Sequence, residues 1–507
     1  MSQALANLKR GPIMAAIIIG AFVTILNQTL LNVALPSIMD DLGITTNTAQ
    51  WLTTGFMLVN GVLIPLSAYL VRRFTTRQLF ITAMLLFLIG TVFCAFAESF
   101  TVLMVGRIIQ AAGAGIMMPL MSIVVLTIFK VEERGKAMGM MGVAMIFAPA
   151  VGPTLSGWIV EHHSWHVLFY IIAPFALLAL VFGMIFMKNV SETAKPKLNS
   201  LGVILSTLGF GGLLYGFSEA GNNGWNSTEV YVSLIVGAVA LILFVMKELL
   251  NKQEPLLEFR VFKYDMYSLT TVVNILITMA MYAGMILVPV YMQNILGLSP
   301  IKSGLALLPG AILMGIMSPV TGAIFDKIGA RWLAVVGLVI TAATTWEFGQ
   351  LTVDTTYTHM VIIYTLRMFG MSMLMMPIQT AGLNQLPQRL NPHGSAMSQT
   401  LRTVGGALGT AWLVTVMSNK TKELVTEMVV SAQIDPKDPA NADQMIKITN
   451  EATVSGINHA FLYAFWLTIA ALVLAFFIKK TKPQKDFKAD VETQGNSQAS
   501  AQASAEA

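Results

Sequence analysis

The feature that most constrains the fold is a series of long apolar runs with few or no charges. Runs of about 20 residues, the length of an α-helix that crosses a bilayer, follow one another from Ile13 to Ile478. Because lipid offers no partners for backbone N–H and C=O groups, such runs cross the membrane as helices. We count fourteen, at 13–35, 50–71, 78–97, 102–126, 136–160, 166–187, 200–218, 229–246, 268–294, 303–325, 332–352, 358–378, 397–417 and 459–478.

The composition excludes a soluble protein. Only 11% of the 507 residues are charged and 55% are hydrophobic, whereas roughly a quarter of a soluble domain is charged. We therefore expect an all-α integral membrane protein, whose first run is a retained span because it is longer than a signal-peptide core. The single cysteine, Cys94, cannot form an internal disulfide and indicates neither a metal nor a cofactor.

The positive charges predict the orientation. If the N-terminal side is taken as the cytoplasm, 23 of the 31 Lys and Arg residues lie in loops on that side and five on the other. Because Lys and Arg accumulate in cytoplasmic loops, we expect a multi-pass protein of the cell membrane with both termini in the cytoplasm. The net charge of +5 is assigned to this asymmetry, and no nucleic acid is expected as a partner.

Two halves of the chain repeat each other. Arg77 is matched by Arg331, 254 residues later, and Arg107 by Arg367, 260 residues later. Parallel six-helix repeats form two bundles that rock against each other. We expect two such bundles at 1–190 and 268–480, two inserted helices with a cytoplasmic amphipathic linker at 191–267, and a disordered cytoplasmic tail at 481–507. The linker could equally be a plain solvated one, and 419–458 is expected to be a polar outer loop.

The fifth run carries small residues and prolines at fixed intervals. Small residues let two helix backbones approach closely in lipid, and a Gly-Pro pair bends or stiffens the helix at the contact. One interpretation is a seam along which two bundles rock; an ordinary small-residue helix interface explains the same pattern. The residues concerned are Gly139, Ala148, Gly152, Pro153, Ser156 and Gly157.

The loop between the tenth and eleventh runs predicts an inner gate. An aspartate can cap a helix end, cations can face a helix terminus or anionic lipid, and a glycine permits close packing. A simple positive-inside turn would explain the cations but not the glycine spacing. The residues of this proposed charge latch are Gly322, Asp326, Lys327, Gly329 and Arg331.

Arg107 is a cation within the fourth run, and Gln110 follows on the same helix face. An arginine at membrane depth is costly unless it faces a partner or a water-filled cavity. We therefore expect a proton-relay or gating role for Arg107, with a structural cation bonded to backbone carbonyls as the alternative. Arg367 repeats the position in the second half.

These three features together resemble the major facilitator superfamily and, within it, the fourteen-span drug:proton antiporters. The resemblance covers nearly every run, with Ala148 in place of a glycine of the antiporter motif. It implies a monomer with two six-helix bundles and two inserted helices. It also implies hydrophobic or cationic small-molecule substrates, protons and membrane lipid as partners, and no cofactor.

The first run departs from the resemblance, because Asn27 and Gln28 stand where members commonly carry a carboxylate. A carboxylate can load and release a proton as its surroundings change, and an amide cannot. Gln28 either replaces a proton-carrying acid or only hydrogen-bonds substrate. If proton coupling persists, Glu347 is the preferred carrier, although an outer-interface position fits it nearly as well, and Glu219 is the second. The expected substrate-pocket residues are Asn27, Gln28, Asn32 and Asn60.

The sequence therefore predicts a secondary active exporter of hydrophobic or cationic compounds that works by alternating access and is driven by inward proton flow. An uptake carrier or uniporter of the same fold without proton coupling is the alternative. The chain has no phosphate-binding glycine loop and no catalytic cluster, so we expect neither ATP use nor an enzyme. The histidines near Glu161 resemble metal ligands in spacing but are assigned to the membrane interface, and no metal site is expected.

Overall fold

The computed structural model describes residues 9–190, 199–250, 255–432 and 441–479. Within these ranges the regular elements are helices, with short 3-10 turns η1 (Val131–Glu133), η2 (Phe259–Lys263) and η3 (Gln388–Leu390) between them. The long helices are α2 (Arg10–Leu42), α3 (Thr46–Arg73), α4 (Thr76–Ala95), α5 (Phe100–Ile128), α6 (Arg134–His162), α7 (His166–Phe186), α8 (Ser200–Asn223), α9 (Thr228–Leu250), α10 (Asp265–Asn294), α11 (Pro300–Ile328), α12 (Ala330–Phe348), α13 (Tyr357–Ser372), α14 (Met375–Gln385), α15 (Asn391–Ser431) and α16 (Ala442–Ala475).

Twelve helices in the described part of the chain are long and apolar enough to cross a membrane. They include the segment Tyr357–Gln385, which the structure divides into α13 and α14. Two further spans were expected at 332–352 and 397–417. Helices α12 and α15 occupy these ranges but are not among the twelve, so the predicted count of fourteen is not confirmed.

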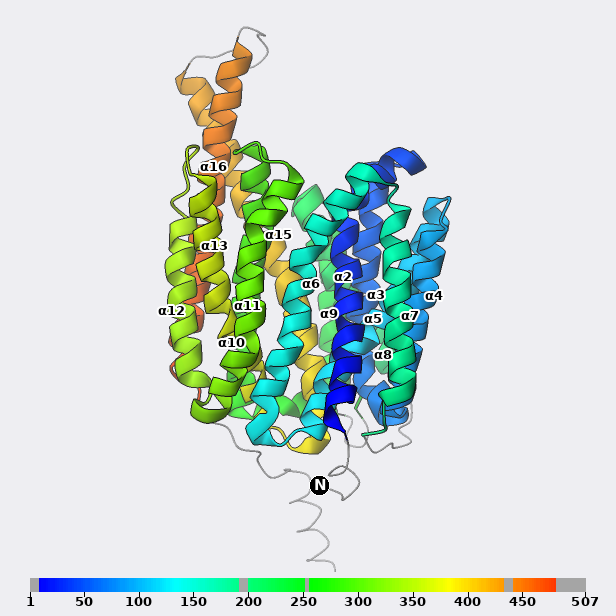
Figure 1. The fold of residues 1–507 in the computed structure, drawn as a ribbon. Helices are drawn as coiled ribbons and strands as arrows, with labels where there is room; N and C mark the ends of the chain where they lie inside the picture. The colour runs from blue at the N-terminus through cyan, green and yellow to red at the C-terminus, as the bar shows by residue number, and fades with distance from the viewer. Residues whose placement is uncertain (1–8, 191–198, 251–254, 433–440, 480–507) are drawn as a thin grey trace, which may run out of the picture.

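The helices stand side by side in two groups (Figure 1). Helices α2 to α7 lie on one side, α10 to α16 on the other, and α6 and α11 adjoin along the boundary between them. We call the face at which α2 begins the lower face and the opposite one the upper face, as Figure 1 is drawn.

Each group has its own apolar core. The buried residues of one large cluster come almost entirely from α2 to α7, and those of a second come from α10 to α16. A smaller cluster joins the inserted helices to both groups, because Phe210 of α8 and Phe244 of α9 pack with Ala68 of α3 and Met397 of α15. The described helices thus form two groups with separate cores, and α8 and α9 pack against both.

The segment after α9 is packed rather than solvated. Residues 251–254 lie outside the described part, but Leu256 and Leu257 are buried in the small cluster that joins the two groups. The Leu256 backbone N–H donates to Glu248 Oε2 at 2.5 Å. The described end of this linker therefore packs against the helices, and its place on the cytoplasmic face stays a prediction.

The expected polar outer loop is largely helical. Helix α15 continues to Ser431 and α16 begins at Ala442, and together they project beyond the upper face (orange in Figure 1). The physical reason is local: the segment after Asn419 is rich in good helix formers, and Lys420 pairs with Glu423 one turn on, at 3.1 Å. The prediction of a loop at 419–458 was wrong outside 433–440, which the structure does not describe.

One predicted run is broken. The twelfth run, 358–378, divides into α13 and α14 at Met373 and Leu374. Pro377 lacks the N–H that would bond to the Met373 carbonyl in a continuous helix, and its ring crowds that position. The predicted disordered tail at 481–507 lies outside the described residues.

Candidate functional site

Helices α6 and α11 pack against each other along their full length. Near the lower face, Gly135 and Gly139 of α6 meet α11 so closely that a Cβ on Gly139 would overlap the Ser318 carbonyl oxygen. Ser318 Oγ donates to the Gly139 carbonyl at 2.9 Å. Near the upper face, a Cβ on Gly157 would lie 3.2 Å from Ile301. Glycine thus permits close backbone contact at this interface.

The motif of small residues on α6 divides between two neighbours. Gly139 and Gly157 face α11, whereas Gly152 and Ser156 face α2. Ser156 Oγ donates to the Leu30 carbonyl at 2.6 Å, and a Cβ on Gly152 would overlap the Thr29 side chain. Ala148 is fully buried and its carbonyl accepts from Thr29 Oγ1 at 3.4 Å, while Pro153 is half-buried. The small residues of this motif therefore let α6 pack closely against α2 of its own group and against α11 of the other group.

Asp326 caps the lower end of α6. Its Oδ1 accepts from the Gly135 N–H at 2.8 Å and its Oδ2 from the Lys136 N–H at 2.9 Å. A carboxylate at a helix N-terminus satisfies free N–H groups and complements the helix dipole. Gly322, one turn earlier on α11, allows this approach because a Cβ there would overlap the Gly135 carbonyl.

The rest of the predicted latch lies elsewhere. Arg331 Nε donates to the Phe476 carbonyl at the end of α16, at 2.7 Å, and so holds the second group together. Gly329 has a φ of +85°, which lets the chain reverse between α11 and α12, and Lys327 is exposed. Gly322 and Asp326 are the residues of this loop that contact the start of α6 through Gly135 and Lys136.

A second contact joins α6 to α14 near the lower face, and it was not predicted from the sequence. Arg134, at the start of α6, donates from Nη1 to Asn384 Oδ1 of α14 at 3.0 Å and from Nη2 to the Leu126 carbonyl at 2.5 Å. The signal that could have found it is the group of amides, among them Gln379, Asn384 and Gln385, at the end of an otherwise apolar run.

Arg107 lies at the centre of a buried polar cluster on four helices. Its Nη1 donates to Gln110 Oε1 at 2.9 Å and its Nε to the Leu52 carbonyl at 3.5 Å. Gln110 Nε2 donates to Thr91 Oγ1 at 2.8 Å, and Asn27 Nδ2 donates to Gln110 Oε1 at 3.1 Å. Arg107 and Gln110 are 1% and 0% exposed, so the cluster is cut off from water.

The charge of Arg107 is balanced without an acid. In the described part of the chain no carboxylate pairs with Arg107; its guanidinium instead lies over the Phe56 ring, 4.3 Å from the ring centre. Neutral oxygen acceptors and an aromatic face can stabilise a buried cation. The cluster therefore holds a permanent charge beside amides that cannot titrate.

The other predicted site residues are spread out. Gln28 is half-buried next to Asn27, and Asn60 of α3 keeps a buried Oδ1 without a hydrogen-bond partner among the described residues. Asn32 lies in α2, but its side chain is not described. Glu219 is half-buried near the upper end of α8, and Glu347 ends α12 with a half-exposed side chain 3.3 Å from His359.

The chain is similar to known transporters along most of its length. Residues 17–410 match the family model described as Major Facilitator Superfamily. The chain is 48% identical over 492 residues to the MFS-type transporter YhcA of Bacillus subtilis, covering 92% of each chain. It is 44% identical over 473 residues to the lincomycin resistance protein LmrB of the same organism, covering 93% of this chain and 96% of LmrB.

A solved structure shares the fold. The human organic anion transporter MFSD10 superposes with a TM-score of 0.61 over 91% of this chain and 100% of its own, at 12% identity. With the family match across both halves of the helical bundle and relatives above 40% identity over nine tenths of the sequence, this chain belongs to the major facilitator superfamily of membrane transporters.

Proposed function

We propose that this protein is a secondary active exporter that moves hydrophobic or cationic compounds out of the cell in exchange for protons. The observation that carries the proposal is the close contact of α6 with both α2 and α11, built on glycines at positions where a Cβ would overlap a neighbour. Such a contact gives two bundles a smooth surface on which to rock. The 44% identity to a lincomycin resistance protein supports drugs as the class of cargo.

In this proposal the lower face is the cytoplasmic gate, and both termini are cytoplasmic. The distribution of Lys and Arg supports that orientation. The gate consists of Asp326 on the start of α6, the Arg134–Asn384 bond, and a buried apolar cluster that joins Leu126 of α5 to Tyr267 of α10 and Leu383 of α14. Opening toward the cytoplasm requires α6 to leave Asp326, so the two backbone bonds hold the gate shut.

Glu219 is a better candidate for the proton carrier than Glu347. Helix α3 holds Arg107 through the Leu52 carbonyl and the Phe56 ring, and Thr54 between them contacts Ser218 Oγ of α8 at 3.3 Å. Glu219 follows Ser218 directly. A protonation change at Glu219 could therefore act on the α3 segment that positions Arg107.

Glu347 lacks such a connection. It lies at the upper end of α12, its side chain is 49% exposed, and it pairs with His359. Helix α12 packs mainly on α13 and α16 rather than on the helices of the Arg107 cluster. Its position is that of a carboxylate at the upper interface.

The proposal is tested with the purified full-length chain in lipid vesicles. With a fluorescent lipophilic cation such as ethidium, we expect movement driven by an imposed pH difference, lost on addition of a protonophore and reduced in Glu219→Gln but not in Glu347→Gln. Ethidium movement that survives collapse of the gradient would exclude proton coupling. No movement in either direction would contradict a transport function for this class of compound.

The alternative is an uptake carrier or uniporter of the same fold. The observation that favours it is the lack of an acid in the Arg107 cluster, where Asn27 and Gln28 are amides. Gln28→Glu tests the part played by Gln28: if Gln28 replaces a proton-carrying acid, transport by the variant gains pH dependence relative to the parent. An unchanged pH profile would remove that interpretation of Gln28.

A further inference from the structure

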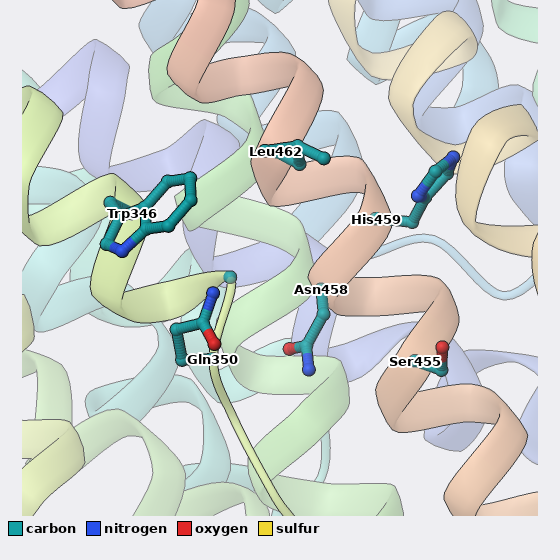
Figure 2. Close-up of a pocket in the computed structure, with 7 residues that line it drawn as sticks. Trp346, Gln350, Ser455, Asn458, His459 and Leu462 are labelled. Carbon is teal, nitrogen blue, oxygen red and sulfur yellow. The ribbon is translucent and has the colours of Figure 1, made fainter.

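A small pocket with a mixed polar and apolar lining lies at the upper rim of the molecule, away from both the Arg107 cluster and the gate. It is formed between the end of α12 and the middle of α16, and its walls include Trp346, Gln350, Ser455 and Asn458 (Figure 2). His459 also lines it, and no lysine or arginine does. Trp332, fourteen residues before Trp346 on α12, is also exposed. The two indoles are separated by about 21 Å along the helix, consistent with tryptophans at the two membrane interfaces.

The pocket contains an acceptor that has no donor. Asn458 Nδ2 donates to the Leu351 carbonyl at 2.8 Å, which fixes the orientation of the amide. Asn458 Oδ1 is shielded from bulk water and accepts no hydrogen bond from any described residue. Figure 2 shows this oxygen directed toward the side on which Gln350 lies. Because a buried acceptor without a donor is costly, the site favours a ligand that carries an N–H or O–H group.

The surroundings favour a positive charge on that ligand. Helix α12 ends at Phe348, and the carbonyl end of a helix carries partial negative charge. The Trp346 ring, 46% exposed, offers an aromatic face to a cation. Gln350 and Ser455 supply donors that suit a neighbouring phosphate.

We propose that this pocket binds the primary ammonium group of an amphiphile whose apolar tail lies along the outer surface of α12 and α16. Asn458 Oδ1 accepts from the ammonium, and Trp346 faces its charge. The ammonium could belong to a membrane aminophospholipid or to a free amine with an alkyl tail. The assignment does not depend on the proposed transport activity.

The test compares lipids that differ only in their head groups. Phosphatidylethanolamine and phosphatidylcholine with identical acyl chains have the same net charge, but only the former has N–H donors. Each is added to the full-length protein in a neutral detergent, and bound lipid is measured by native mass spectrometry. We expect the protein to retain phosphatidylethanolamine about tenfold better, because a hydrogen bond to a charged group is lost with phosphatidylcholine.

Variants assign the preference to the pocket. Asn458→Leu should abolish the discrimination, Asn458→Asp should keep it, and Trp346→Leu should weaken binding of both lipids. Trp332→Leu, on the same helix at the lower end, is the matched control and should change nothing. Equal retention of both lipids by the parent protein, together with equal shifts from the two dodecyl amines compared below, would overturn the proposal, as would discrimination that survives Asn458→Leu. If Asn458→Leu does not fold, unchanged binding in Trp346→Leu overturns it, since that exposed ring is dispensable for folding.

A second arm identifies the source of the ammonium. Dodecylamine and dodecyltrimethylammonium are compared by the shift they cause in the unfolding temperature of the protein. The pocket is assigned to free amines if dodecylamine gives the larger shift, Asn458→Leu abolishes that difference, and the protein shows no lipid preference. If the protein prefers the N–H-bearing compound in both experiments, the pocket is assigned to the primary ammonium group that lipid and amine share. Ethidium transport should be unchanged in Asn458→Leu, so the outcome here is independent of the exporter proposal.

Discussion

Arg107 and Arg367 hold matching places in the two halves of the chain, but they are stabilised in different ways. Arg107 donates into an amide network that joins α2, α4 and α5. Arg367 donates from Nη2 to the Ala280 carbonyl at 2.7 Å and lies beside the stacked rings of Phe348 and Phe461, and its Nε and Nη1 have no hydrogen-bond partner among the described residues. One half builds a polar network around its cation, and the other encloses its cation in aromatic packing.

The difference comes from the residue three positions on. Gln110 follows Arg107, whereas Gly370 follows Arg367. A Cβ on Gly370 would lie 2.8 Å from Thr341 Oγ1 and 2.9 Å from the Gly337 carbonyl, so α12 and α13 leave no room for an amide there. The second half thus has closer helix packing in place of a polar network. We infer that the first arginine serves function and the second serves packing.

The largest expected effect is on transport. Arg107→Met should lower ethidium transport by about two to three orders of magnitude, equivalent to roughly 3–4 kcal/mol, because it removes the only charge in the network. Arg367→Met, the matched control, should stay within about twofold. Initial rates in vesicles, normalised to the amount of protein, measure both. Equal losses in the two variants would break the comparison.

The next effect is on stability. Gln110→Leu leaves Arg107 Nη1 and Asn27 Nδ2 without their acceptor, and should lower the free energy of unfolding by about 2–3 kcal/mol. Thermal unfolding of the purified protein measures it. Gln110→Glu keeps the acceptor oxygens and should lose less; a smaller cost for leucine than for glutamate would show that the network does not stabilise the first half.

Arg367→Met should act in the opposite direction on stability. It removes a buried charge with two unpaired N–H groups and fills the same space with an apolar side chain, so we expect a gain of about 1–2 kcal/mol. The same unfolding measurement applies, with Arg73→Met, an exposed arginine at the end of α3, as the control. A lowered unfolding temperature in Arg367→Met would show that the packed arginine has a partner beyond Ala280.

The smallest effect concerns the rings. Phe56→Leu removes the aromatic face 4.3 Å from Arg107. It should lower the free energy of unfolding by about 1 kcal/mol more than the loss of apolar contact alone would. Phe348→Leu is the matched variant, with its ring centre 5.7 Å from Arg367, and should show a smaller excess. The excess is obtained from a double-mutant cycle with the corresponding Arg→Met variant. A coupling energy of zero between Phe56 and Arg107 would show that the ring does not stabilise the arginine.

Part of the fold and part of the candidate site could be predicted from the sequence, and the rest could not. The spacing of Arg107 and Gln110 places them on one helix face, and the glycines of the fifth run indicate a close helix contact, because both follow from helix geometry. Two other features depend on which helices become neighbours in the folded protein. They are the contact of the same motif with α2 and the hydrogen bond from Asn27 to Gln110, 83 positions apart. The Arg134–Asn384 bond, across 250 positions, was missed for the same reason.

The projecting ends of α15 and α16 have a practical consequence. A transporter whose mass lies almost wholly within a micelle gives electron-microscopy images with little to align on. Here a pair of helices rises above the upper face and marks one side of the molecule only. An antibody fragment raised against that pair would break the pseudo-symmetry of the particle and report its orientation.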